Sequence, residues 1–162
     1  MFRSRTILVV SAVVVVLGAG GVGQARSTAR SLPPLRTQPT PAAVVREHLD
    51  ALNSCDWNRL MAQYPPSVHF FLPGGQVVIG RAAVGTLFAG FCKTHAEKGF
   101  RGITFTSHVV QKVGDTINVQ WVATAPFMKP YKGADAYVTK NGLMWAQVTT
   151  FGAPPPVYVT GS

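Results

Sequence analysis

The sequence predicts an α+β fold in which three N-terminal helices pack in a curved antiparallel sheet and form a cone-shaped pocket. Helical periodicity runs through residues 42–53, and alternating apolar and polar residues fill most of 102–151. Gly-Asp and Asn-Gly pairs separate the alternating runs, which is typical of hairpin turns. Together these three observations predict one pocket-forming domain.

Three helices are expected first. In residues 42–53 the apolar positions recur at helical spacing, so one stripe of this helix should be buried: Val44, Val45, Leu49, Ala51 and Leu52. Asp56 can cap a short second helix over 57–64, which Pro65 and Pro66 end. Gly80 leads into a third helix over 81–99.

The strands follow from alternation and turn residues. A first hairpin joins 67–72 to 76–80 through the turn PGGQ. The later strands are expected over 102–113, 116–127, 134–140 and 143–151.

The first 25 residues predict a secretory signal peptide. Arg3 and Arg5 precede an apolar run over 7–23, and small residues around Gln24 favour cleavage after Ala25. An uncleaved anchor is the alternative, because the run is close to the minimum length of a spanning helix. Either form predicts a secreted or periplasmic, cell-envelope protein, which meets the membrane only through this segment if it is uncleaved.

The rest of the chain has room for one domain. Residues 26–41 combine four prolines with three arginines and predict a flexible segment. The domain spans 42–152, and the proline-rich tail over 153–162 is expected to wander over its surface.

The formal charge of +9 raises the question of a nucleic-acid partner. The basic residues are scattered singly and lack the interleaved aromatic residues of a stacking platform. We therefore expect a solvated basic surface and no nucleic-acid partner.

Two cysteines, Cys55 and Cys92, leave two interpretations open. An oxidising compartment permits a disulfide between them, provided that their Cα atoms lie within about 7 Å. The alternative is two small buried thiols.

The segment order resembles a known family over residues 42–151. The carrying motifs are the Gly-Gly hairpin, the helix start G-R-x-A-V at 80–84 and the closing hairpin G-x-D-x-Y at 133–137. They resemble the SnoaL-like branch of the nuclear-transport-factor-2-like (cystatin-like cone) superfamily, which includes ketosteroid isomerases, polyketide cyclases, limonene epoxide hydrolases, scytalone dehydratases and non-catalytic members. The resemblance implies a homodimer through the outer face of the sheet.

The resemblance also implies site residues. Where the isomerase pattern has a tyrosine donor on the first helix, this chain has His48, and Asp135 matches the acid of the last hairpin. The proton-shuttling base of the first strand falls at Phe71, so that base is missing, although His69 could face the same side.

Strand parity predicts the rest of the cavity. If Asp135 faces inward, Tyr137 and Thr139 do too. The paired strand brings either Trp145 and its alternate neighbours or the complementary set to that face, and the spacing from Gly142 to Phe151 favours the first set. The expected ligand pocket is lined by Phe71, His69, Trp121, Tyr137, Trp145, Gln147, Thr149 and Phe151.

Two functions remain open. The favoured one is an exported, non-catalytic pocket for a small hydrophobic molecule, because the base position holds Phe71. The alternative is a cofactor-independent acid/base enzyme of the isomerase, cyclase or dehydratase type that uses Asp135 and His48. The same pair can also be purely structural. No histidine pair has metal-ligand spacing with a carboxylate and no phosphate loop is present, so we expect no metal and no cofactor.

Overall fold

The computed structural model describes residues 30–159, so the expected leader lies outside the described residues. The domain belongs to the α+β class, as the sequence predicts. Its helices are α1 (Pro41–Asn53), α2 (Trp57–Ala62), α3 (Arg81–Phe91) and the short 3-10 helix η1 (His95–Glu97). Its strands are β1 (His69–Phe71), β2 (Val77–Ile79), β3 (Thr104–Val113), β4 (Thr116–Ala125), β5 (Met128–Lys140) and β6 (Leu143–Phe151).

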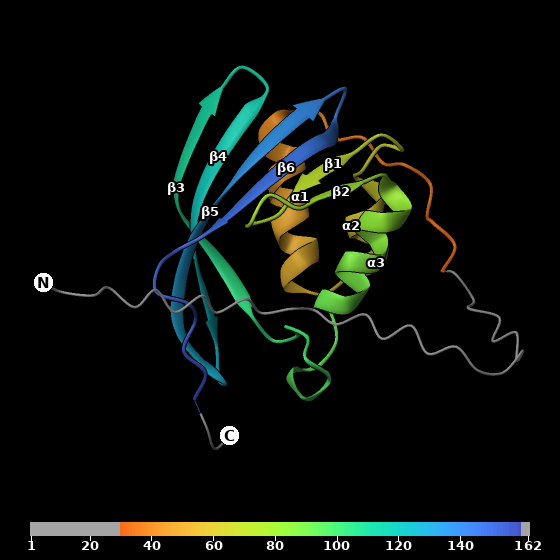
Figure 1. Ribbon diagram of the computed structural model, residues 1–162. Helices are drawn as coiled ribbons and strands as arrows, with labels where there is room; N and C mark the ends of the chain where they lie inside the picture. Colours follow the sequence, from red (N-terminus) through yellow and green to blue (C-terminus); the bar gives the residue numbers. More distant parts are fainter. Residues whose placement is uncertain (1–29, 160–162) are drawn as a thin grey trace, which may run out of the picture. The chain divides into compact units, whose positions relative to one another are not determined.

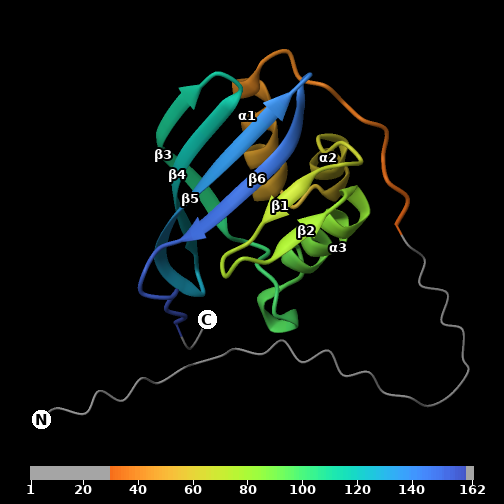
Figure 2. The same cartoon turned by 45° about the horizontal axis from the view of Figure 1, so that its top comes forward.

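The six strands form one curved sheet in the order β2-β1-β6-β5-β4-β3, and the helices lie on its inner side (Figures 1 and 2). One pair corrects the expectation of a wholly antiparallel sheet: β1 and β6 are parallel, so the sheet is mixed. Hairpin turns encode only the pairing of neighbouring strands, and β1 and β6 are distant in the chain. The first hairpin therefore joins the meander in a direction that no turn signal could predict.

Helix caps and turns form where their residues predict them. The Thr40 hydroxyl accepts the Ala43 N–H at 3.1 Å and starts α1, and Asp56 accepts the Arg59 N–H at 3.0 Å and starts α2. The β5–β6 turn has φ of 52° at Asn141 and 73° at Gly142. Positive φ at both central residues matches the right-handed twist of the strands, which explains the Asn-Gly pair.

The third helix is shorter than the expected 81–99, because α3 ends at Phe91. A separate turn, η1, begins after Thr94, whose N–H and hydroxyl both donate to the Glu97 carboxylate, at 3.0 and 2.7 Å. This capping box starts a new helix in place of the old one.

Both flanking segments are fixed to the domain where the structure describes them, contrary to the flexible segment expected over 26–41 and the wandering tail over 153–162. Arg36 N–H donates to Ala62 O, and Gln38 N–H donates to Gly142 O. At the other end, Lys129 N–H donates to Val157 O, and Val159 N–H donates to Phe127 O. The prolines in these segments keep the chain extended, while the residues between them supply the backbone hydrogen bonds.

The main core lies between the helices and the sheet, and a second apolar cluster surrounds Ile103, Trp121, Ala123 and Met128. Within residues 30–159, every helix is too short or too polar to cross a membrane.

Candidate functional site

A cavity of about 190 Å³ lies inside the cone, between α3 and the inner face of β4, β5 and β6. Its walls are mostly aromatic and aliphatic, and the polar side chains that reach it are Asp135, Gln147 and Thr149. Such a cavity, apolar with few convergent polar groups, is typical of a small-molecule site. The remaining lining residues are Leu52, Phe70, Leu72, Leu87, Phe88, Phe91, Phe100, Phe105, Trp121 and Phe151.

Asp135 is the acidic group of this cavity and is 6% exposed. Its Oδ2 accepts hydrogen bonds from Trp121 Nε1 at 3.0 Å and from the Tyr137 hydroxyl at 2.8 Å. Among the described residues no donor bonds to its Oδ1, although Oδ1 is buried. A buried carboxylate oxygen without a donor is costly, so this oxygen can gain from a bound ligand that supplies one.

The surroundings of Asp135 shift its acidity in opposing directions. Burial raises the pKa of its carboxyl group, and the nearby donors of Thr149, Tyr137, Trp121 and Gln147 offset part of the rise. Thr149 and Gln147 stabilise the charge by proximity, but neither donates to Oδ1 with hydrogen-bond geometry. Two donors occupy Oδ2, so a proton on this carboxyl group belongs on Oδ1, which remains unpaired.

Trp121 reaches Asp135 because the residue opposite it is glycine. Trp121 pairs with Gly133 across β4 and β5. A Cβ atom on Gly133 would lie only 2.3 Å from the indole Cζ2 and 2.4 Å from Cη2. The indole therefore lies over the glycine and extends along β5 to the carboxylate two residues further on.

His48 is fully buried on α1 but is not among the residues that line the cavity. Its Nδ1 lies 3.2 Å from the Tyr64 hydroxyl, and its Nε2 has no partner within the described part of the chain. Rings of Tyr64, Phe88 and Tyr137 surround it at centroid distances of 5.4 to 6.1 Å. Burial lowers the pKa of the imidazole to about 3, so His48 is neutral at physiological pH.

The expected contact between His48 and Asp135 is replaced by a longer polar chain. The Tyr64 hydroxyl lies between His48 Nδ1 and Gln147 Oε1, at 3.2 and 3.3 Å. Tyr137 covers the imidazole with its ring and donates its hydroxyl to Asp135. Burial raises the pKa of both tyrosines well above the ordinary value, so both stay protonated. Tyr64 was not predicted from the sequence, because it falls after α2 and outside any alternating strand.

On β6, the structure brings Gln147, Thr149 and Phe151 to the cavity, as strand parity predicts. The prediction is wrong for Trp145, which lies outside the cavity and donates its Nε1–H to Lys140 O at 3.1 Å. The register shifts between Val138 and Thr139, so that Thr139 pairs with Met144. This bulge inserts one extra residue, and fully buried Met144 takes the inward position expected for the tryptophan.

On β1 the inward residue is Phe70, which is 4% exposed and lines the cavity. The predictions for Phe71 and His69 are wrong, since these side chains lie on the opposite face and stack on each other at 6.3 Å. Successive side chains of a strand face opposite sides, so an error of one residue reverses every assignment. The inward position of β1 is thus also occupied by an aromatic ring.

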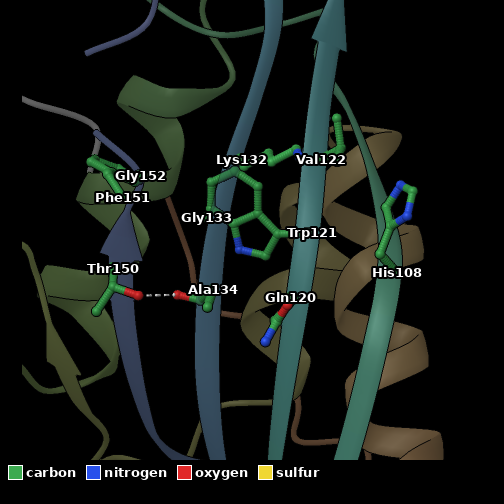
Figure 3. Close-up of a pocket in the computed structure, with 10 residues that line it drawn as sticks. All are labelled: His108, Gln120, Trp121, Val122, Lys132, Gly133, Ala134, Thr150, Phe151 and Gly152. Carbon is green, nitrogen blue, oxygen red and sulfur yellow. Dashed lines mark hydrogen bonds between the residues drawn. The ribbon is translucent and has the colours of Figure 1, made fainter. Parts of the chain in front are cut away.

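A larger hollow, of about 400 Å³, lies elsewhere, on the outer face of the sheet (Figure 3). His108, Gln120 and Lys132 line it, and the Thr150 hydroxyl beside them donates to Ala134 O at 2.9 Å. It does not include Asp135. We therefore place the candidate site in the interior cavity.

Cys55 and Cys92 are not joined in a disulfide, and Cys92 is buried as the second interpretation expects, whereas Cys55 is only half-buried. Within residues 30–159, no three His, Cys, Asp or Glu side chains lie close enough together to hold a metal ion.

The fold and the interior cavity define a cone-shaped α+β pocket domain, and the comparisons with known proteins agree. The chain belongs to the SnoaL-like domain family, which matches residues 45–148. A search of curated proteins finds no match.

Solved structures share the fold at low identity. An NTF2-like protein of unknown function from Cytophaga hutchinsonii is 15% identical, with a TM-score of 0.57 over 73% of this chain and 95% of its own. A provisionally assigned ketosteroid isomerase from Kribbella flavida is 20% identical, with a TM-score of 0.57 over 72% and 82%. A provisionally assigned polyketide cyclase from Pseudomonas putida is 13% identical, with a TM-score of 0.61 over 72% and 94%.

Proposed function

We propose that the domain binds a small apolar molecule with one hydroxyl group, which hydrogen-bonds to Asp135. The observation that carries this proposal is Asp135 Oδ1, a buried acceptor without a donor among the described residues, in the wall of an apolar cavity. A hydroxyl group fits both states of the carboxyl group, because it donates to the carboxylate and accepts from the acid.

The size of the cavity limits the ligand. An apolar cavity of about 150 Å³ in another protein stays dry and binds benzene. The cavity beside Asp135 measures about 190 Å³, so it suits a compound with one ring. Phenol is therefore the simplest probe of the site.

Two observations favour binding over acid/base catalysis. A reaction of the isomerase or cyclase type needs, besides a donor to the developing oxyanion, a proton-transfer base that faces the substrate. His48 lies behind Tyr137 and outside the cavity lining. The inward residue of β1 is Phe70, which cannot transfer a proton.

We expect phenol to raise the melting temperature of the wild-type domain and toluene to raise it less, because toluene has no hydroxyl group. In Asp135→Asn, the phenol affinity should fall about tenfold, since a charge-assisted hydrogen bond contributes roughly 1.5 kcal/mol or more. Titration calorimetry with phenols of increasing acidity gives the sharper result. The affinity should rise with acidity for the wild type and stay level for Asp135→Asn.

The matched control is Asp50→Asn, which makes the same chemical change on an exposed position of α1. This variant should bind phenol as the wild type does. Equal phenol affinity in wild type and Asp135→Asn would contradict the proposed role of Asp135.

Two further features are part of the proposal. Export rests on the leader-like residues 1–25, and N-terminal sequencing of the protein from the culture medium or cell envelope tests it. A cytoplasmic protein whose N-terminal sequence still begins at Met1 would contradict export.

A homodimer is supported by the outer sheet face, where Val109, Val138 and Val148 are each 37–39% exposed. Sedimentation of the domain at monomer mass would contradict it.

A further inference from the structure

A second chamber of about 140 Å³ adjoins the first. It lies between the start of β5, the inner side of β4 and the C-terminal tail. Ala123, Met128 and Tyr131 line it from the sheet, and Pro156 and Tyr158 line it from the tail.

The tail builds this chamber because it is fixed in place. Met128 and Tyr158 form an isolated β-bridge, with backbone hydrogen bonds of 2.9 and 3.0 Å on either side. The His95 ring stacks on Tyr158 at 5.3 Å and on Phe127 at 4.4 Å, which holds the tail against the loop after α3. Pro156 and Tyr158 lie beyond residues 45–148, the part of the chain that the family model matches.

The two chambers share one side, and every shared residue is aromatic: Phe91, Phe100, Phe105, Trp121 and Phe151. Neighbouring rings in this set meet at centroid distances of 5.1 to 6.3 Å, as Phe105 does with Trp121. Trp121 faces both chambers and also donates to Asp135. The second chamber therefore lies next to the cavity that contains Asp135.

The lining of the second chamber is apolar and suits a hydrocarbon group. The Tyr131 hydroxyl already donates to Gly152 O at 2.7 Å, and the Trp121 N–H already donates to Asp135. Ile103, Ala123 and Met128 add apolar side chains that are at most 6% exposed. Apolar walls of this kind gain from burying hydrocarbon.

We propose that the second chamber binds an apolar tail on the ligand that Asp135 holds, so that the ligand class is a phenol or ring alcohol with a short alkyl or aryl substituent. This inference rests on the proposed function. It adds that the chain's own C-terminal tail extends the site and selects longer ligands.

Titration calorimetry with phenol, 4-ethylphenol, 4-propylphenol and 4-butylphenol tests this inference. For the wild type we expect roughly a fourfold gain in affinity per added methylene group that enters the chamber. Ala123→Leu places three more carbons in the chamber without reaching the cavity beside Asp135. It should bind phenol as the wild type does and lose the gain from the longer chains.

Ala89→Leu is the matched control, because it makes the same change on an exposed position of α3 and should keep the full series. Tyr158→Ala is the second test variant. It removes one wall of the second chamber and should also abolish the gain in affinity from longer alkyl chains. Tyr158 is already 44% exposed, so this variant should fold even if Ala123→Leu does not.

The outcomes separate the two proposals. If none of the phenols binds the wild type, the proposed function fails and this inference fails with it. If phenol binds but the longer phenols gain nothing, or if Ala123→Leu and Tyr158→Ala both keep the full gain, only the second chamber's role is overturned.

Discussion

Lowering the pH from 6.5 to 5 should cost the folded domain about 1.6 kcal/mol through His48 alone, because the loss approaches about 1.36 kcal/mol per pH unit only below the unfolded pKa. The folded pKa is lowered to about 3, so the folded state keeps the imidazole neutral while the unfolded chain, with a pKa near 6.5, takes up a proton. The unfolded state then binds more protons, and stability falls as the pH falls from about 6.5 towards 3. Urea unfolding at pH 6.5 and pH 5 measures this loss.

The variant His48→Asn isolates this effect. It keeps a polar group near Tyr64 but cannot titrate, so its stability should change about 1.6 kcal/mol less than that of the wild type between the two pH values. The raised pKa of Asp135 acts in the opposite direction, since that carboxyl group binds a proton more readily in the folded state. Asp135 is present in both proteins and its contribution cancels in the comparison.

His108→Asn is the control, because the His108 side chain is exposed. It should follow the wild-type dependence on pH. An identical loss of stability in His48→Asn and in the wild type would show that His48 does not carry the acid sensitivity.

Gly133→Ala should destabilise the domain by about 1–3 kcal/mol, the usual cost of overpacking. The added Cβ would meet the Trp121 ring at 2.3 Å and the Thr150 carbonyl oxygen at 2.7 Å. The carbonyl belongs to the neighbouring strand and cannot move away alone, so the indole must shift. The same shift breaks the bond from Trp121 to Asp135, and phenol affinity should fall together with the free energy of unfolding.

Gly90→Ala is the control with the opposite expected sign. Gly90 lies in α3, and no atom lies within 4 Å of the position that its Cβ would take. Alanine there should stabilise the domain by roughly 0.5–1 kcal/mol, because it restricts the unfolded chain and favours the helix. If both variants changed stability in the same direction, the steric explanation for Gly133 would be wrong.

Local signals predicted most of the fold. Periodicity located α1, and Asp56 and the Asn141-Gly142 pair marked a helix start and a hairpin that the structure confirms. The long-range pairing of strands could not be predicted, because nothing near β1 in the sequence encodes its parallel contact with β6. The position of the C-terminal tail was not predicted either. Its prolines indicated a loop, whereas its backbone groups form hydrogen bonds with the segment at the start of β5.

The site was predicted in part, and the errors on the strands share one cause. Asp135 and Gln147 reach the cavity because alternation holds along their strands. The β6 bulge displaced Trp145, and an offset of one residue reversed the three-residue β1 strand, so that Phe70 replaced Phe71. The alternation of side chains predicts the inward residues reliably along a long regular strand. It fails where a bulge adds a residue, and where a strand is too short for its inward face to be assigned from the sequence. Tyr64 was missed because only the tertiary fold brings it between His48 and Gln147.

The most direct measurement is a titration of the Asp135 carboxyl carbon by NMR, with and without phenol. Burial and the unpaired Oδ1 predict that the pKa of this carboxyl group lies above the ordinary value of an aspartate in the unliganded domain. Phenol should then lower the pKa of Asp135, because a hydroxyl donor stabilises the carboxylate more than the acid. A pKa at the ordinary aspartate value that phenol leaves unchanged would contradict a buried carboxyl group that holds the ligand.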